Sequence, residues 1–190
     1  MELILASKSP RRKEILEREG FKFKIESKNT DETMDASLTP YQNVMNVARR
    51  KGEAVYQDFP NDVILSTDTI VCLDGKIYGK PKDREDAYRT LKAFSGRVHE
   101  VVSGVSIISS NLCMTMYVKS HVEFKALTEE MINSYLDTKE PYDKAGSYAI
   151  QGEGRKLIQS YKGSLDNIIG LPIEYIKDTL RVILNEVENR

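Results

Sequence analysis

The pattern of hydrophobic and polar positions predicts a chain of mixed strands and helices. Apolar runs without helical spacing predict strands, and apolar residues three or four positions apart predict helices. The predicted strands are Leu3–Ala6, Val63–Leu65, Ile70–Leu73, Ile77–Tyr78, Val98–Ile108, Met114–Phe124 and Leu157–Tyr161. The predicted helices begin around Ser9, Thr39, Asp83, Thr128 and Pro172. Because the two longest strands are consecutive, we expect antiparallel pairing and a mixed α/β fold rather than a doubly wound parallel sheet.

Capping signals strengthen two of these helix starts. Ser9 followed by Pro10 is typical of an N-cap and first helical position, and Gly20 suits the end of that helix. Thr39 and Gln42 have the spacing of a capping box, again with proline at the first helical position. Local chemistry alone therefore predicts where both helices begin.

Composition narrows the class of protein. The 190 residues, 40% hydrophobic and 30% charged, suit one globular domain at 1–190 with room for two lobes. Lys and Arg number 28 against 29 acidic residues, so we do not expect nucleic-acid binding through bulk charge. No apolar run approaches the roughly 20 residues of a membrane span, and no signal-peptide pattern is present. Cys72 and Cys113 are predicted as buried free thiols, which indicates a cytoplasmic protein.

Several common motifs are missing, which narrows the chemistry. The P-loop pattern GxxxxGKS/T does not occur. Gly152-Glu153-Gly154 lacks the third glycine of a dinucleotide-binding loop, since Leu157 stands in its place. The two histidines, His99 and His121, have no metal-ligand spacing, so zinc is not expected. A metal held by Asp or Glu oxygens would be Mg²⁺ or Mn²⁺.

The segment from Ser7 to Arg12 has the character of an anion site. It joins a predicted strand to a predicted helix, where free backbone N–H groups and the helix dipole attract anions. Arg11 and Arg12 oppose that dipole, yet a guanidinium group suits bidentate contact with phosphate. Two solvated surface arginines are the alternative, and this segment alone does not decide between them.

Four other side chains are candidates for chemistry. Lys51 falls on the apolar face of its predicted helix, so it either extends into solvent or meets an anion in a cleft. Asp68 interrupts an apolar strand, as a structural hydrogen-bonding group or as a general base or metal ligand. Lys80 and Lys144 stand beside or near glycines in predicted turns, where the backbone can approach a ligand closely. The alternative for each is a solvent-exposed turn lysine.

Taken together, these segments resemble the Maf family of nucleotide pyrophosphatases along the whole chain. The matching stretches are LILASKSPRRKEIL at 3–16, STDTIVCLDGKIYGKPKD at 66–83, FSGRVHEVVSGV at 94–105, EPYDKAGSYAIQG at 140–152 and GSLDNIIGLPI at 163–173. The resemblance implies a mixed twisted sheet with flanking helices and two lobes around a central cleft, similar to inosine triphosphate pyrophosphatases. It also implies a divalent metal and cleavage of a nucleoside triphosphate between its α- and β-phosphates.

The resemblance assigns expected roles to individual residues. The family's catalytic aspartate falls on Asp68, and its lysines fall on Lys51, Lys80 and Lys144. We expect Asp68, Lys51 and Lys80 to be catalytic. The early acidic residue of the family falls on Glu32, so Glu32 and Asp68 are the expected metal ligands. The expected substrate-binding residues are Ser7, Arg11, Arg12, Thr69, Lys144 and Gln151.

Three positions point to a substrate class within the family. Arg12, Thr69 and Gln151 match the branch that acts on dTTP and UTP. A glutamine amide both donates and accepts hydrogen bonds, so it suits the O4/N3–H edge that thymine and uracil share. Gly52 and Leu165 depart from the family pattern, which puts fine substrate preference in question rather than activity.

Two alternative functions stay open. The 7-methyl-GTP branch of the family is one, although Thr69 and Gln151 argue against it. The other is a nucleotide-binding interaction protein linked to septum formation. The expected partner is a small nucleoside triphosphate, without membrane or nucleic acid, and a homodimer is left open.

Overall fold

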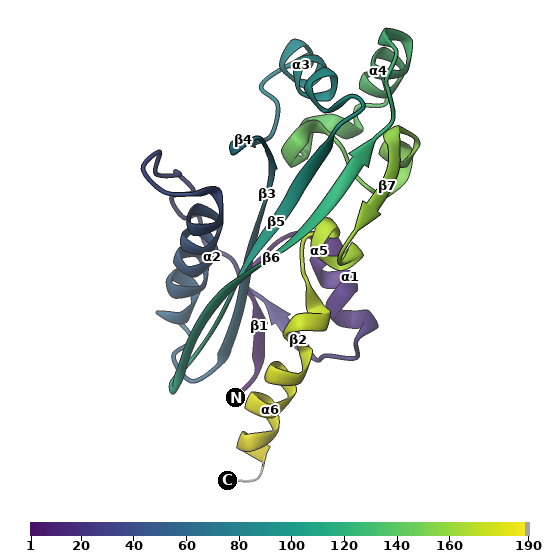
Figure 1. Ribbon diagram of the computed structural model, residues 1–190. Helices are drawn as coiled ribbons and strands as arrows, with labels where there is room; N and C mark the ends of the chain where they lie inside the picture. The colour runs from purple at the N-terminus through teal and green to yellow at the C-terminus, as the bar shows by residue number, and fades with distance from the viewer. Residues whose placement is uncertain (189–190) are drawn as a thin grey trace. The chain divides into compact units, whose positions relative to one another are not determined.

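Residues 1–188 of the computed structural model are described, and they combine a mixed sheet with flanking helices (Figure 1). The strands are β1 (Leu3–Leu5), β2 (Phe23–Ile25), β3 (Val63–Leu73), β4 (Lys76–Tyr78), β5 (Val98–Ser109), β6 (Leu112–Phe124) and β7 (Ile158–Lys162). The α-helices are α1 (Pro10–Arg18), α2 (Pro40–Tyr56), α3 (Arg84–Phe94), α4 (Glu129–Leu136), α5 (Leu165–Ile169) and α6 (Lys177–Glu188). Short 3₁₀ helices are η1 (Glu140–Asp143), η2 (Ala145–Ser147), η3 (Gly152–Leu157) and η4 (Ile173–Tyr175). None of the described helices is long and apolar enough to cross a membrane.

The sheet contains both parallel and antiparallel pairs. Its order is β2-β1-β3-β5-β6-β7, with β4 paired to β3. β1 runs parallel to β2 and β3, and places Leu3 opposite Phe23 and Val63. β4 is antiparallel to β3, and β7 is antiparallel to β6. A two-residue connection joins β5 to β6 as a hairpin, so the predicted mixed α/β fold is confirmed.

The helices α2 and α3 begin at predicted caps whose side chains make the capping hydrogen bond. The Thr39 side chain accepts a hydrogen bond from the Gln42 N–H, and the Gln42 side chain accepts one from the Thr39 N–H, which completes the capping box of α2. Asp83 caps α3. Ser9 occupies the N-cap of α1 with Pro10 after it, but its side chain makes no capping hydrogen bond.

Some predicted boundaries were wrong. The polar residues 66–69 do not interrupt an apolar strand, because β3 continues through them. Pro172 precedes only the short helix η4, and α6 begins later because Ile176, at φ −126°, leaves helical geometry. Strand β2 and helix α5 were not predicted, because they have three and five residues and carry little periodic signal.

The prediction that both cysteines are buried was half wrong. Cys72 lies buried in β3, and burial raises the pKa of its thiol to about 12. Cys113 is exposed, because the first six residues of β6 form the tip of the hairpin and none of them is buried. Alternation along a strand does not reveal how far the strand extends beyond the core.

The chain divides into two compact units. Unit 1 consists of 1–68, 103–118 and the chain from Gly170 onward. Unit 2 consists of 69–102 and 119–169. Strands β3, β5 and β6 therefore contribute residues to both units, and each unit has a hydrophobic cluster of its own.

In unit 1, helix α2 packs its apolar face on the strands. Val55 joins Ile4 and Ile64 in a buried cluster, and Val44 is fully buried. Gly104 of β5 lies against the helix backbone, where a Cβ atom would come within 2.4 Å of the Val44 carbonyl oxygen. This close packing fixes the position of α2, and with it the direction of the side chains on its inner face.

Close packing explains why a glycine, Gly52, follows Lys51. A Cβ atom on Gly52 would lie 2.6 Å from Oγ of Ser66. The buried Ser66 hydroxyl needs that space, since it donates a hydrogen bond of 2.7 Å to the Ala48 carbonyl. Gly52 thus brings α2 close to β3 beside Asp68.

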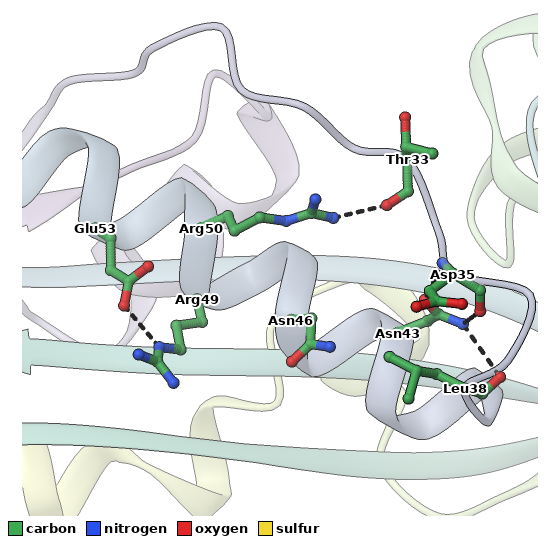
Figure 2. Close-up of a pocket in the computed structure, with 8 residues that line it drawn as sticks. All are labelled: Thr33, Asp35, Leu38, Asn43, Asn46, Arg49, Arg50 and Glu53. Atoms are coloured by element: carbon green, nitrogen blue, oxygen red, sulfur yellow. Dashed lines mark hydrogen bonds and ion pairs between the residues drawn. The ribbon is translucent and has the colours of Figure 1, made fainter.

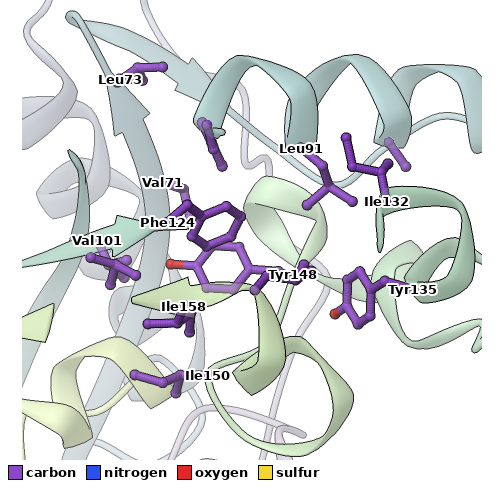
Figure 3. Packing of buried hydrophobic residues seen from close by; sticks show 14 of the residues in the cluster. Val71, Leu73, Leu91, Val101, Phe124, Ile132, Tyr135, Tyr148, Ile150 and Ile158 are labelled. Carbon is purple, nitrogen blue, oxygen red and sulfur yellow. The ribbon is translucent and has the colours of Figure 1, made fainter. Parts of the chain in front are cut away.

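In unit 2, aromatic side chains gather around a buried histidine. The ring of His99 stacks on Phe94 with 4.3 Å between centroids, and Phe124 and Tyr148 meet it edge-on. Its Nε2 lies 2.7 Å from the Tyr148 hydroxyl. Figure 3 shows Phe124 and Tyr148 among the apolar side chains of this cluster. Desolvation lowers the pKa of His99 to about 3.

Acid is expected to destabilise the protein through His99. The unfolded chain binds a proton as the pH falls below about 6.5, whereas the folded state keeps His99 neutral until about pH 3. The contribution of His99 to the free energy of unfolding is therefore fully present above pH 6.5. Below that pH it falls by roughly 1.4 kcal/mol per pH unit. Urea unfolding between pH 4 and 7 should show a shallower pH dependence in His99→Gln.

His121→Gln serves as the control for this measurement, because that side chain is 42% exposed. It should keep the wild-type dependence on pH. An equal slope in wild type and His99→Gln would exclude His99 as the source of acid sensitivity.

Candidate functional site

Three charged side chains of unit 1 meet at one point. Nζ of Lys51 lies 2.7 Å from Oδ1 of Asp68 and 2.9 Å from Oε1 of Glu32. The Lys51 and Asp68 side chains are only 16% and 13% exposed, whereas Glu32 is 62% exposed. Of the two alternatives for Lys51, the structure therefore favours the inward one. A loop, a helix and a strand each supply one member of this group.

Asp68 is the last residue of β3 that belongs to unit 1. The two residues before it are buried, and their hydroxyls donate hydrogen bonds to carbonyls far away in the chain. Ser66 donates to the Ala48 carbonyl, and Thr67 donates to the Gly170 carbonyl at 3.2 Å. These bonds allow a polar run to continue a buried strand. Asp68 is then held in extended backbone with its carboxylate toward Lys51, which offsets the cost of burying a charge.

Arg12 adds a second cation to the same region. Burial lowers the pKa of Arg12, while the negative charge of Asp68 and, more weakly, that of Glu32 raise it. Nε of Arg12 donates to the Gly170 carbonyl at 3.0 Å, and its Nη1 donates to Oγ of Ser7 at 3.0 Å. The guanidinium is therefore fixed in direction while its charge still acts on the carboxylates.

The start of α1 stands beside these groups in the chain. Oγ of Ser7 also accepts from the Ser9 N–H at 3.3 Å, which ties the strand end to the helix start. Because Ser9 makes no side-chain cap, its hydroxyl does not occupy the first N–H groups of α1. Arg11, partly buried, lies in the first turn. This end of α1 has the chemistry of an anion site.

In unit 2, two lysine-bearing segments lie side by side. The Gly146 N–H donates to the Gly79 carbonyl at 3.0 Å, so the segment with Lys144 runs next to the one with Lys80. Gly146 has φ +70°, and a Cβ atom there would lie 2.9 Å from a Val71 methyl group. Only glycine fits that position without strain. Lys144 pairs with the Asp143 carboxylate, and Lys80 is exposed.

Glu140, which was not among the predicted site residues, closes the loop that carries Gln151. Oε2 of Glu140 accepts a hydrogen bond from the Glu153 N–H at 2.9 Å. Gly152, at φ +72°, passes so close that a Cβ atom would lie 2.8 Å from Oε1 of Glu140. The segment from Lys144 to Gln151 lies inside this closed loop. Gln151 itself is exposed, and Thr69 follows Asp68 directly in the chain.

The structure thus brings the predicted residues together in two sets. Unit 1 gathers Ser7, Arg12, Glu32, Lys51 and Asp68. Unit 2 places Lys80 near Lys144, with Gln151 on the same closed loop as Lys144. Gly170 and Glu140 were missed, because a backbone carbonyl carries no residue-type signal and a lone glutamate in a turn looks like ordinary surface.

The carboxylates of unit 1 suit a divalent cation. Glu32 and Asp68 converge on the ammonium of Lys51, so two sets of hard oxygen donors already face one positive charge. Within residues 1–188, no three His, Cys, Asp or Glu side chains gather as a ready metal cage. Mg²⁺ is usually held by one or two carboxylates together with substrate phosphates and water, so this pair fits that chemistry.

Comparison with known proteins decides the family. A family model described as Maf-like protein matches residues 2–183. The chain belongs to the Maf family. Curated relatives of this Maf protein include one from Bacillus pumilus, 42% identical over 96% of this chain and 95% of its own length. Another, from Clostridioides difficile, is 45% identical over 95% and 94% of the two chains. Both carry the name dTTP/UTP pyrophosphatase.

A solved structure shares the fold of this Maf protein. The Staphylococcus aureus Ham1 protein aligns over 65% of this chain and 72% of its own, with a TM-score of 0.50 and 14% sequence identity. At that identity the likeness concerns the fold alone. It agrees with the mixed α/β architecture described above.

Proposed function

We propose that this Maf family member hydrolyses dTTP and UTP to the monophosphate and pyrophosphate. The observation that carries the proposal is the convergence of Asp68, Lys51 and Glu32 in unit 1, with Arg12 beside them. A buried carboxylate next to cations is the arrangement that phosphoryl transfer needs. The names of the relatives support the substrate class.

Asp68 is the proposed base. It accepts a proton from the water whose oxygen bonds to the α-phosphorus, while the bond from that phosphorus to the bridging oxygen breaks. The electron pair of the broken bond leaves with pyrophosphate, and the proton passes from Asp68 to solvent. Such a positioned base contributes on the order of 10²–10⁴ to the rate.

The cations and the helix end act on the phosphates. Lys51 and Arg12 offset negative charge near Asp68, and the free N–H groups at the start of α1 suit phosphate oxygens. Lys80 and Lys144 are proposed to hold the leaving pyrophosphate. When bound, a divalent metal on Glu32 and Asp68 neutralises further phosphate charge. Each group works by position and charge rather than by forming covalent bonds.

Thr69, Gln151 and Arg12 are proposed to select the base. The Gln151 amide has one acceptor and two donors, so it matches the carbonyl and N–H that thymine and uracil present together. Cytosine presents the opposite pattern at that edge. A mismatched, unpaired polar group costs about 1–3 kcal/mol, which corresponds to roughly 5- to 150-fold in specificity.

A panel of triphosphates tests the proposal. Purified protein with Mg²⁺ or Mn²⁺ is incubated with dTTP, UTP, CTP, GTP and 7-methyl-GTP, and monophosphate and pyrophosphate are quantified. We expect kcat/KM for dTTP and UTP to exceed that for CTP by about fivefold or more. If dTTP and UTP are the poorest substrates, the branch is wrong. If no substrate yields pyrophosphate, the protein is a nucleotide-binding module instead.

We also propose a cytoplasmic location. Both cysteines are free, which suits a reducing compartment, and the nucleotide pool is found there. The lack of nucleic-acid binding and the cleft between two lobes stay predictions, and a homodimer stays open.

A further inference from the structure

The expected metal ligand Glu32 lies on a segment without regular structure. No helix or strand occurs between the end of β2 at Ile25 and the start of α2 at Pro40. The Glu32 side chain is 62% exposed, so packing alone does not fix it. A ligand on such a segment would lose much of its affinity to conformational entropy unless other contacts hold the backbone. The contacts that do so come from α2.

Arg50 contacts both neighbours of Glu32, one through its backbone and the other through its side chain. Its Nη2 donates to the Thr33 carbonyl at 2.8 Å, and its Nη1 lies 3.5 Å from Oδ2 of Asp31. Oδ1 of Asp31 in turn accepts from the Thr33 N–H at 2.8 Å, which closes a tight turn around Glu32. Figure 2 shows Arg50 extending from the helix to the carbonyl of Thr33.

Asn43 makes a second attachment farther along the same segment. Its side-chain amide accepts from the Asp35 N–H at 2.7 Å and donates to the Asp35 carbonyl at 2.8 Å. Asn43 is buried, so this attachment is rigid. A shallow pocket lies between the helix and the segment, as Figure 2 shows. Arg50 spans the distance between helix and segment at the Glu32 end, where Asn43 does not reach.

We propose that Arg50 is a positioning residue, which orients Glu32 so that its carboxylate meets Lys51 and Asp68. Arg50 and Lys51 are neighbours on α2, so one turn of helix holds both the backbone around Glu32 and the carboxylate itself. The planar guanidinium can serve two acceptors at once, which a lysine at this position cannot do with fixed geometry. This inference rests on the proposed role of Glu32 as a metal ligand.

Arg50→Gln tests the proposal with three measurements. Amide hydrogen exchange of residues 31–34 should become faster, because the segment loses its attachment at the Glu32 end while Asn43 still holds Asp35. Mn²⁺ binding to the protein without nucleotide, followed by electron paramagnetic resonance, should weaken by about tenfold or more, as expected when a residue that orients a ligand is removed. The Mn²⁺ concentration for half-maximal dTTP hydrolysis should rise in parallel, while kcat at saturating Mn²⁺ changes little.

Two further variants serve as controls. Arg49→Gln removes the same charge from the same helix, but Arg49 pairs with Glu53 at 2.6 Å on the helix surface. It should match the wild type in all three measurements. Arg50→Lys keeps the charge and one hydrogen bond, so it should fall between wild type and Arg50→Gln. Thermal unfolding of each variant verifies that it is folded.

Several outcomes would overturn the proposal. The proposal is refuted if Arg50→Gln matches Arg49→Gln in all three measurements. It is also refuted if exchange at residues 31–34 becomes faster without weaker Mn²⁺ binding, since Arg50 would then only hold the segment. In a Glu32→Gln background, Arg50→Gln should weaken Mn²⁺ binding no further. Additive losses there would show that Arg50 does not act through Glu32. If the wild type cleaves no triphosphate, the proposed function fails, while exchange and Mn²⁺ binding still decide the role of Arg50.

Discussion

Asp68→Asn is expected to lower kcat for dTTP by at least about a hundredfold while the protein stays folded. An amide cannot take the proton of the attacking water, and it is a weaker ligand for a hard cation. The shape of the side chain is unchanged, and Asn still accepts a hydrogen bond from Lys51. Steady-state kinetics with dTTP and UTP, together with circular dichroism, measure both parts of this expectation.

Asp74→Asn is the matched control for Asp68→Asn. Asp74 lies in the turn after the same strand, at φ 51°, a conformation that asparagine also adopts readily. It pairs with Arg97 rather than with residues of the site, so turnover should stay near that of the wild type. A near wild-type turnover in Asp68→Asn would eliminate Asp68 as the base.

Lys51→Gln is expected to lower kcat/KM by about a hundredfold, or roughly 2–4 kcal/mol of transition-state stabilisation. The change removes an ammonium group that contacts both Asp68 and Glu32. Without it, two carboxylates face each other, which increases the affinity of the site for a divalent metal. Mn²⁺ should therefore raise the Tm of the variant more than it raises the Tm of the wild type. Kinetics and thermal unfolding with and without Mn²⁺ measure these effects.

Lys13→Gln is the control for the loss of a lysine. Lys13 pairs with Glu17 on the surface of α1 at 3.5 Å, and both side chains are about half exposed, so neither activity nor Mn²⁺ response should change. Unaltered kinetics in Lys51→Gln would mean that this lysine serves only the folded structure.

Local signals predicted the helices well. The capping box of Thr39 and Gln42 and the cap at Asp83 each depend on residues within one turn of helix, so the sequence alone reveals them. The wrong prediction at 66–69 shows the limit of such signals. Ser66 and Thr67 continue a buried strand only because carbonyls from α2 and from the segment after α5 accept their hydroxyls.

The sequence by itself determined which side chains are available and, through its resemblance, the family. It placed Asp68 between two apolar strand segments and Lys51 on an apolar helical face, but left a structural and a chemical role open for each. Only the tertiary structure decided that Lys51 turns inward to Asp68 and Glu32, and that Arg50 holds the segment of Glu32. These contacts join residues 17 or more positions apart, and no local pattern encodes them.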